Sequence, residues 1–464
     1  MKSHTYGRKA LACAGATLLA VTTLLSACSS PSGTGTTGTT GATGAAGGDG
    51  SCTNKITKAS APQVTVWAWY PAFEEVVDLF NSTHDDVQIC WSNVGAGGNE
   101  YNRFTTAIQA KSGAPDVIQL ENEVLGGYLI QDALVDLTKY GANDVKANYT
   151  EGAWKDSSSG DGVYAIPVDG GPVGFMYRQD IFDKYKVAVP KTWEDFAQAA
   201  QQLKDAGFQG YMTDYAPNAI AEWQGLYNQA GASTFSFDIA NPEKLGVDIN
   251  SAPAKKVQAY WNDLISKKLV ATDDAFTTDW YTKIVDGTYA TVVAAAWQPG
   301  YLSGIAGADP AAKWVSAPIL QWNGAKPAQV NWGGSTFAVT TQAKQPDLAA
   351  KVALDVFGNL DAWKIGVEKA ALFPTYLPEL TSDSFKNLAS PFFNGQQINK
   401  DVYLPAAQGY SGTVYSPFTT YYYDQMTQAN AKMIQGDITS DQVLDQVQDA
   451  IVSYATQQGF TVNK

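Results

Sequence analysis

The chain has 464 residues, about three times a common domain length, so we expect two domains or lobes. Hydrophobic residues make up 45% and charged residues 16%, which is typical of a folded globular protein. Acidic residues outnumber basic ones by 45 to 31, and the net charge of −14 excludes the basic surface that nucleic acids require. The two histidines, His4 and His84, are too few for a multi-histidine metal site.

Residues 1–27 predict a secretory signal peptide. Basic residues precede an apolar run over residues 10–25, which is too short to span a membrane comfortably. The run ends in LSAC, and this motif resembles a lipobox, at which bacterial lipoproteins are lipidated on the cysteine and cleaved just before it. We therefore expect Cys28 to carry a lipid anchor. A plain signal peptide with an incidental cysteine is the alternative.

Residues 28–60 predict a lipid-anchored linker. The stretch 29–51 is rich in Gly and Thr, has one charge and contains no large apolar side chain, so it cannot pack against a core. Such a tether places the folded body at the outer face of a membrane.

Two cysteines remain in the folded body. Cys52 and Cys90 form an even pair in an oxidising compartment, which predicts a disulfide. A bridge over this distance in the chain would stabilise the fold by about 4 kcal/mol in the chain-entropy model. Two unpaired buried thiols are the alternative.

Strand and helix patterns alternate along the first part of the body, which predicts an α/β lobe with a mostly parallel sheet. Strands are predicted over residues 63–69, 87–91 and 116–120, and helices over residues 71–80, 101–111 and 123–131. Thr192, three residues before Asp195, predicts a capped helix start. Further along, we expect extended segments over 163–168, 173–177, 291–296, 314–320 and 335–340, and helices over 180–185, 348–369 and 443–452.

Carboxylates follow two of the predicted extended segments. Glu121 and Glu123 come directly after a strand, and Asp169 precedes a Gly-Gly pair. Open α/β sheets bind ligands at the carboxyl ends of their strands. Such acids could form an acid–base couple for glycoside hydrolysis or accept hydrogen bonds from sugar hydroxyls, and solvated surface acids are the alternative.

The glycine-rich stretch 95–100 suggests a phosphate cradle, but Glu100 stands where the last glycine of a dinucleotide motif belongs, so a turn is favoured.

Aromatic residues are abundant, with 13 Trp, 24 Tyr and 18 Phe. Several tryptophans stand beside small or polar residues, namely Trp67, Trp69, Trp223, Trp280, Trp297 and Trp332. Flat aromatic faces stack on the C–H faces of pyranose rings, while nearby amides and carboxylates bind the hydroxyls. Any one of these tryptophans is more often a core residue, but the group predicts a sugar site. The run Tyr421 to Tyr423 is part of this aromatic group, although on one helix the three side chains point in different directions.

Sequence segments in a characteristic order resemble the extracellular carbohydrate-binding lipoproteins of ABC importers, relatives of maltose-binding protein. The resemblance rests on VTVWAWY (64–70), GAPDVIQLENEVLGGYLIQDALVDLT (113–138), YAIPVDGGPVGFMYRQDIFDKYKVAVPKTWEDF (164–196), GTYATVVAAAWQPGYL (287–302) and residues 333–357. Arg178 departs from the asparagine that is usual after the tyrosine. The third of these segments is the most specific, and together they extend over nearly all of residues 61–464.

The resemblance implies an α/β, two-lobed periplasmic-binding-protein-like fold with mostly parallel sheets flanked by helices and a ligand cleft between the lobes. Crossings are expected near Pro167, Pro318 and Pro374. The N-lobe would comprise 61–167 and 319–373, and the C-lobe 168–318 and 374–464. Combined with the aromatic and carboxylate patterns, it predicts ligand contacts at Trp67, Trp69, Tyr70, Glu121, Asn122, Glu123, Asp169, Gly171, Trp223, Trp297, Gln298, Trp332, Phe373, Tyr421 and Tyr422.

The implied function is capture of a carbohydrate, most simply an oligosaccharide, by hinge closure and its delivery to the permease subunits of an ABC importer. The protein would be a monomer anchored through Cys28 at the extracellular face of the bacterial cytoplasmic membrane, with no catalytic residue, metal, cofactor or nucleic-acid partner. The alternatives are an exported glycoside hydrolase that uses paired carboxylates, and a receptor for a non-sugar solute such as a peptide or polyol.

Overall fold

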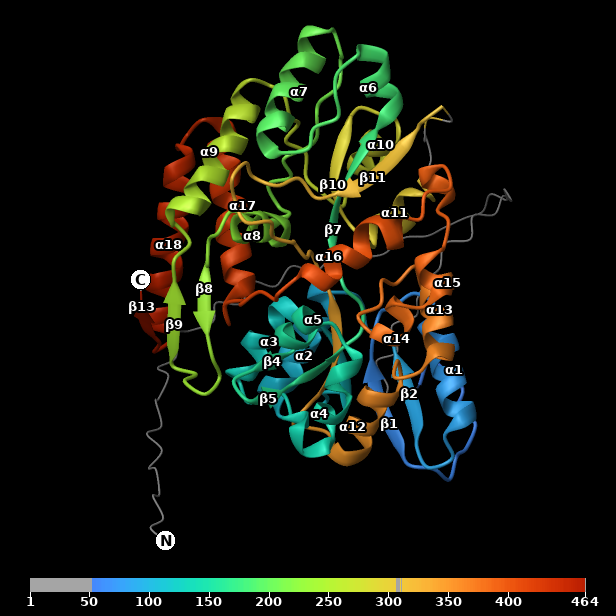
Figure 1. The fold of residues 1–464 in the computed structure, drawn as a ribbon. Helices are drawn as coiled ribbons and strands as arrows, with labels where there is room; N and C mark the ends of the chain where they lie inside the picture. Colours follow the sequence, from blue (N-terminus) through green and yellow to red (C-terminus); the bar gives the residue numbers. More distant parts are fainter. Residues whose placement is uncertain (1–51, 306–308, 310, 464) are drawn as a thin grey trace, which may run out of the picture. The chain divides into compact units, whose positions relative to one another are not determined.

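The computed structural model describes residues 52–305, 309 and 311–463 (Figure 1). The predicted signal peptide, Cys28 and the glycine-rich stretch 29–51 lie outside the described residues. The described body contains two main sheets, each with its own hydrophobic core. Within it, no helix combines the length and the apolar character needed to cross a membrane.

The first sheet has the strand order β2-β1-β3-β12-β6. Its strands are β1 (Gln63–Trp67), β2 (Gln88–Ser92), β3 (Val117–Glu121), β6 (Ala165–Pro167) and β12 (Ser335–Val339). Strand β1 pairs in parallel with β2 and β3, whereas β12 pairs antiparallel with β3 and β6. The prediction of a mostly parallel sheet is therefore correct for the first three strands only, because β12 returns from the second sheet in the opposite direction.

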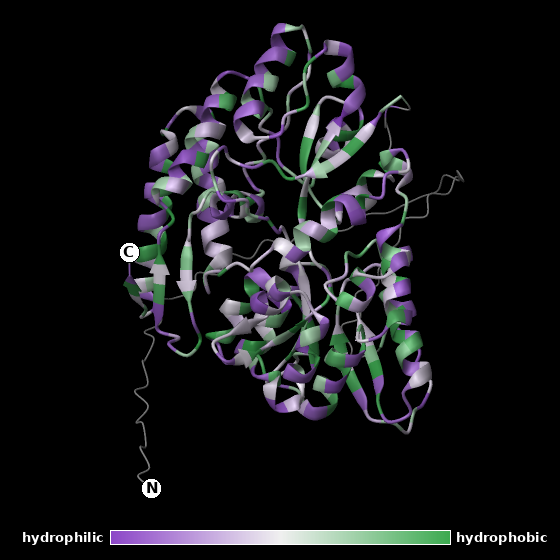
Figure 2. Cartoon of the chain, in the orientation of Figure 1, coloured by the Kyte–Doolittle hydropathy of each residue, from purple (hydrophilic) through white to green (hydrophobic). Residues whose placement is uncertain are grey.

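Helices cover both faces of this sheet. The residues of β12 alternate between two cores, with Phe337 and Val339 in one and Ala338 in the other. One core includes residues of α1 (Phe73–Thr83), α12 (Pro346–Asp355) and α13 (Leu360–Ala370), and the other includes residues of α2 (Gly98–Ala110) and α3 (Asn122–Leu129). Figure 2 shows that these helices carry both hydrophobic and hydrophilic residues, as expected for elements with one buried face.

The second sheet has the order β10-β7-β11 and is antiparallel throughout, which corrects the prediction of parallel pairing there. Its strands are β7 (Val173–Arg178), β10 (Thr291–Ala295) and β11 (Trp314–Pro318). Its core includes residues of α6 (Gln179–Tyr185), α7 (Trp193–Asp205), α8 (Ile220–Gln229), α9 (Ala252–Ser266), α10 (Thr278–Val285), α17 (Thr419–Gln435) and α18 (Ser440–Gln457). A small sheet of β8 (Phe235–Phe237), β9 (Lys244–Val247) and β13 (Thr461–Asn463) was not predicted.

Shorter elements complete the described body. They are α4 (Ala142–Val145), α5 (Glu151–Asp156), β4 (Ser158–Ser159), β5 (Gly162–Val163), α11 (Gln298–Leu302), α14 (Leu377–Leu380), α15 (Asp383–Lys386) and α16 (Leu404–Gly409). The predicted cap of α7 is confirmed, since Thr192 Oγ1 accepts from the Asp195 N–H at 3.1 Å. The prediction of one helix over 348–369 is wrong, because the structure has two helices there, α12 and α13. Asn359 caps the start of α13, where its side chain accepts from the Ala362 N–H at 2.9 Å.

The chain passes between the two sheets at three places. Two crossing segments lie side by side, where the Gly170 N–H donates to the Phe373 carbonyl at 2.9 Å and the Thr375 N–H donates to the Val168 carbonyl at 3.0 Å. The third crossing differs from the one expected near Pro318. Residues 319–332 still contribute Ile319, Leu320, Trp322, Val330 and Trp332 to the core of the second sheet, and the chain reaches the first sheet only at Ser335.

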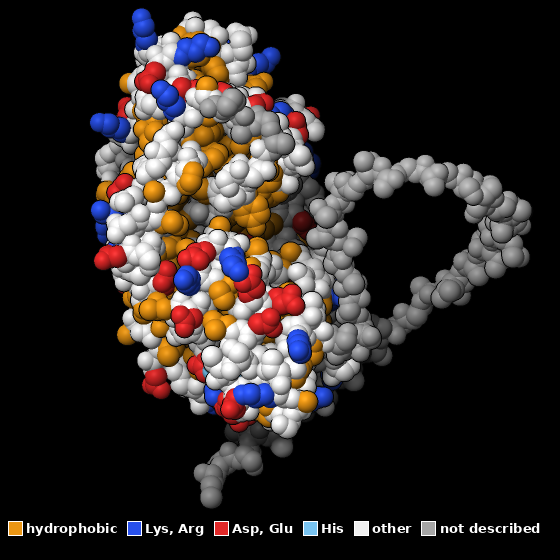
Figure 3. Space-filling model, turned by 90° about the vertical axis from the view of Figure 1, so that its right-hand side faces the viewer, with side chains coloured by type: hydrophobic (Ala, Val, Ile, Leu, Met, Phe, Trp, Pro, Cys, Tyr) orange, Lys and Arg blue, Asp and Glu red, His pale blue; other side chains and the backbone are white. Residues whose placement is uncertain are grey.

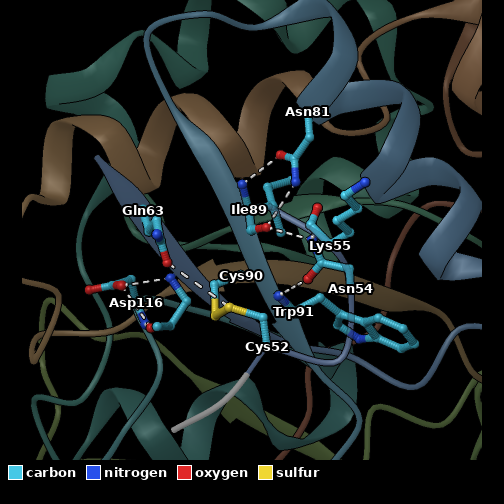
Figure 4. The surroundings of a disulfide bond; sticks show 10 residues. Cys52, Asn54, Lys55, Gln63, Asn81, Ile89, Cys90, Trp91 and Asp116 are labelled. Carbon is cyan, nitrogen blue, oxygen red and sulfur yellow. Dashed lines mark hydrogen bonds between the residues drawn. A yellow bond between two sulfur atoms is a disulfide. The ribbon is translucent and has the colours of Figure 1, made fainter. Parts of the chain in front are cut away.

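The predicted disulfide between Cys52 and Cys90 is confirmed, with its Cα atoms 4.9 Å apart (Figure 4). The neighbouring Asn54 accepts from the Trp91 N–H at 2.7 Å and donates to the Ile89 carbonyl at 2.9 Å. These contacts fasten the start of the described body along β2, the edge strand of the first sheet. The edge is thereby covered, which protects it from pairing with another chain.

Surface side chains are not evenly mixed. On the face drawn in Figure 3, hydrophobic side chains gather in the upper half, and acidic and basic side chains lie close together in the lower half. Concentrated apolar surface is typical of places where a ligand or partner binds.

Candidate ligand-binding site

Three carboxylates enter one cavity from the ends of two strands of the first sheet. Glu121 is the last residue of β3, Glu123 lies in the first turn of α3, and Asp169 follows β6. The cavity has a volume of about 610 Å³, within the range of small-molecule sites. It is also lined by residues from the core of the second sheet, so it lies between the two sheets and their helices.

Each carboxylate accepts a hydrogen bond from a tyrosine hydroxyl. Tyr101 donates to Glu121 Oε2 at 3.2 Å, and Tyr423 donates to Glu123 Oε2 at 3.0 Å. Asp169 Oδ1 accepts from the Tyr70 hydroxyl at 3.2 Å and from the Ser335 N–H at 3.1 Å. These bonds orient the acids and leave further lone pairs open to a ligand.

The enclosure of the three acids raises their pKa values. Burial raises the pKa of Asp169 to about 6, against the lowering effect of the Ser335 N–H and the Tyr70 hydroxyl. Burial also raises the pKa of Glu121, and it raises that of Glu123 with a further contribution from the negative charge of Glu121. The residues that line the cavity include no lysine or arginine, so its electrostatics disfavour an anionic ligand.

Among the residues that the structure describes, no group of three or more His, Cys, Asp or Glu side chains is arranged to hold a metal ion. Carboxylates in a cavity without cations are suited to accepting hydrogen bonds from neutral donors such as hydroxyl groups.

Gln119, on strand β3, lines the cavity and carries one side-chain group that is unpaired among the described residues. Its side chain is fully buried, and Oε1 accepts from the Trp69 N–H at 2.9 Å. Its Nε2 has no partner within the described protein. An unsatisfied buried amide group is costly, so this Nε2 lowers the stability of the free protein.

Aromatic rings form another part of the lining. The Trp297 and Trp332 ring centroids are 5.3 Å apart, and Trp297 Nε1 donates to the Trp332 carbonyl at 3.0 Å. Phe276 and Tyr301 flank Trp297, with centroid distances of 6.3 and 5.8 Å. Rings of this kind provide apolar faces for a ligand that also carries polar groups.

About half of the predicted contact residues meet in this cavity: Trp69, Tyr70, Glu121, Glu123, Asp169, Trp297 and Trp332. Asn122 and Trp67 line other cavities instead. Gly171 lies beside the site, where a Cβ atom would stand 1.8 Å from the Trp332 carbonyl oxygen, so glycine is needed for close approach of two backbone segments.

Three other predicted contacts are core residues in the structure, which corrects their assignment. Trp223 has 1% of its surface exposed, stacks on Tyr215 with centroids 4.2 Å apart and donates to the Ala216 carbonyl. Gln298 is fully buried, and its Oε1 accepts from the Ala295 N–H at 2.7 Å. Phe373 packs against Phe385 and Tyr403 in the core of the second sheet.

The predicted ligand contacts at Tyr421 and Tyr422 are also corrected, because the tyrosine that lines the cavity is the next residue in the chain. Tyr422 is fully buried, and Tyr421 stacks on Tyr454 with centroids 4.2 Å apart. Tyr423 lines the cavity instead and donates to Glu123. Successive helical residues point about 100° apart, so the packing of α17 decides which of the three faces the ligand space.

Several lining residues were not predicted as contacts: Gln119, Asn218, Phe276, Tyr281, Tyr301 and Tyr423. One signal could have found Gln119, since it stands two residues before Glu121 on a strand and residues at that spacing share a face. Phe276 lies in a loop among acids and threonines. Its hydrophobicity alone does not show whether the ring packs in a core or faces a ligand.

Comparison with known proteins supports this architecture. A family model for bacterial extracellular solute-binding proteins matches residues 64–357. The chain is 23% identical over 421 residues to a lactose-binding protein of Rhizobium radiobacter, covering 85% of this chain and 93% of that protein.

Solved structures show the same fold. An ABC transporter associated binding protein of B. animalis subsp. lactis Bl-04, in complex with β-1,6-galactobiose, has a TM-score of 0.73 and 28% identity over 87% of this chain and 100% of that one. The galacto-N-biose/lacto-N-biose I-binding protein of Bifidobacterium longum has a TM-score of 0.74 and 22% identity over 87% and 99%. The predicted two-lobed α/β fold is confirmed, and the chain belongs to the family of bacterial extracellular solute-binding proteins.

Proposed function

We propose that this protein is the substrate-binding component of an ABC sugar importer and captures an oligosaccharide. One observation carries the proposal: a cavity of about 610 Å³ combines aromatic faces with three carboxylates and has no lysine or arginine in its lining. Sugar rings offer apolar C–H faces to the aromatic rings and hydroxyl donors to the carboxylates. The lactose-binding relative and the relative bound to β-1,6-galactobiose support a carbohydrate ligand.

Capture would proceed by closure of two lobes around the sugar. We assign 61–167 and 333–372 to the first lobe and 168–332 and 373–464 to the second, which moves the predicted boundary at 318 to follow the packing of residues 319–332. A ligand that contacts both lobes favours the closed state. The closed, loaded protein then docks on the permease subunits of the importer as a monomer.

The amino-terminal segment would hold the protein at the outer face of the cytoplasmic membrane. The lipobox-like motif at Cys28 and the glycine-rich stretch that follows it support a lipid anchor with a flexible tether. Membership in an extracellular family agrees with this location.

The protein would bind sugar without cleaving it. An exported hydrolase would instead use two of the three acids as an acid–base couple, and such an enzyme releases shorter sugars. The two functions therefore differ in whether product appears.

The test is a titration of intrinsic tryptophan fluorescence, because Trp69, Trp297 and Trp332 line the cavity. The purified protein is mixed with lactose, raffinose, β-1,6-galactobiose and malto-oligosaccharides, with arginine and a dipeptide as non-sugar controls, and each mixture is chromatographed for products. A saturable change with sugars alone and no product supports the proposal. Shorter sugars would support the hydrolase, and a response confined to the controls would contradict a carbohydrate ligand.

A further inference from the structure

Phe276 has an unusual backbone conformation for an aromatic residue. Its φ is +69°, in the left-handed region that bulky side chains rarely adopt. Among the described residues other than glycine with positive φ, it is the only aromatic one. Its side chain is also 51% exposed, so burial in a core does not offset the unfavourable conformation.

The loop that carries Phe276 is held firmly in place. The side chain of Asn218 accepts from the Ala275 N–H at 2.9 Å and donates to the Ala275 carbonyl at 3.3 Å. On the other side, Thr277 caps α10 by accepting from the Trp280 N–H at 3.1 Å. The hydrogen bonds on both sides of Phe276 therefore hold its backbone in one position.

That position is at the rim of the cavity. The Phe276 ring stacks near Trp297 at an interplanar angle of 27°, and its centroid is 5.8 Å from that of Trp332. Tyr301, whose ring centroid is 5.8 Å from that of Trp297, is 56% exposed. In contrast, Tyr70 beside Asp169 is only 5% exposed, so the cavity has a buried polar part and an exposed aromatic part.

We propose that Phe276 and Tyr301 form an outer stacking subsite that receives the third or a later ring of an oligosaccharide whose first rings occupy the inner cavity. This inference rests on the proposed function and extends its ligands to sugars of three or more rings. A residue kept in a strained, exposed conformation by its neighbours is typical of a ligand contact. The outer subsite makes Phe276 and Tyr301 determinants of chain-length specificity.

The test measures affinity by calorimetric titration with β-galacto-, α-galacto- and malto-oligosaccharides of two, three and four rings. Phe276→Ala is expected to weaken binding of the three- and four-ring sugars about fivefold, the size of one aromatic stacking contact, and to change disaccharide affinity less than twofold. Tyr301→Ala should show the same dependence on length. Leu388→Ala, at a residue that is equally exposed and lines none of the cavities described above, is the matched control and should change neither.

A second variant separates binding from folding. Phe276→Gly is expected to lose the same affinity for long sugars but to melt at a temperature no lower than wild type, because glycine adopts this φ without strain. Equal loss of affinity for all lengths, or no loss, overturns the outer subsite and leaves the proposed function in place. A wild-type protein that binds none of the sugars overturns both.

Discussion

Glu123 gives the sharpest test of the cavity electrostatics. Its carboxylate accepts from the Tyr423 hydroxyl at 3.0 Å, and burial together with the charge of Glu121 raises its pKa. A carboxyl group whose pKa is raised on folding binds its proton more tightly in the folded than in the unfolded state. The free energy of unfolding therefore falls as pH rises from the unfolded pKa, about 4.3, through the folded one.

Glu123→Gln removes this effect and keeps an oxygen that can accept from Tyr423. One pKa unit corresponds to about 1.4 kcal/mol, and solvent access to the cavity reduces what the full shift would give. We expect the free energy of unfolding to rise by about 1–2 kcal/mol at pH 8 and to change little at pH 5. Urea unfolding at pH 5, 6, 7 and 8 measures this difference, with the exposed loop variant Glu243→Gln as a control that should stay within about 0.5 kcal/mol.

At a pH above the raised pKa of Glu123, where the carboxylate is charged, the same variant is expected to bind the proposed sugar about tenfold more weakly, because a charge-assisted hydrogen bond becomes a neutral one. Higher stability with weaker binding is the signature of a group kept for function. A gain in stability as large at pH 5 as at pH 8, or a loss at pH 8, would refute the assignment of a raised pKa to Glu123.

Four further outcomes test the remaining assignments. Trp297→Ala should lower sugar affinity at least tenfold, about 1.4 kcal/mol, in fluorescence titration while circular dichroism shows an intact fold. Trp223→Ala should lower the free energy of unfolding by about 3–5 kcal/mol in urea, since Trp223 is a core residue, and unchanged stability would contradict that position. Replacing Cys52 and Cys90 by serine should lower it by about 4 kcal/mol relative to the oxidised protein. Glu100 is fully buried, neither of its carboxylate oxygens has a hydrogen-bond partner among the described residues, and burial raises its pKa well above the usual value. Glu100→Gln should therefore raise the calorimetric melting temperature at pH 8 but not at pH 4.

Local patterns were sufficient to predict most strands and the positions of the acids. The β-rich runs before Glu121 and Asp169 predicted extended segments, and the rule that ligands bind at strand ends then placed both carboxylates in the site. The sense of strand pairing was not predictable in this way. Strand β12 is antiparallel to β3 because the chain first passes through the second lobe, and that path is a tertiary property.

The sequence did not show which face of a helix each aromatic side chain occupies, and this limited the prediction of aromatic contacts. Tyr421, Tyr422 and Tyr423 are chemically equivalent in the sequence, and only the packing of Tyr422 into the core turns Tyr423 towards Glu123. The prediction that Trp223 contacts the ligand was wrong for a related reason. Helix α8 is buried on several sides, and a tryptophan on it can pack in the core as readily as it can line a ligand site.

Unfavourable features are concentrated in the cavity. Gln119 Nε2 lacks a partner within the described part of the chain, burial opposes ionisation of Glu121, Glu123 and Asp169, and Phe276 is exposed with a positive φ. The last two would be relieved by a ligand that donates hydrogen bonds to the acids and covers an aromatic face. These features lower the stability of the free protein, and the proposed sugar should raise its melting temperature by binding only the folded state. Variants that relieve these features singly should raise the melting temperature of the free protein and reduce the further rise that sugar produces.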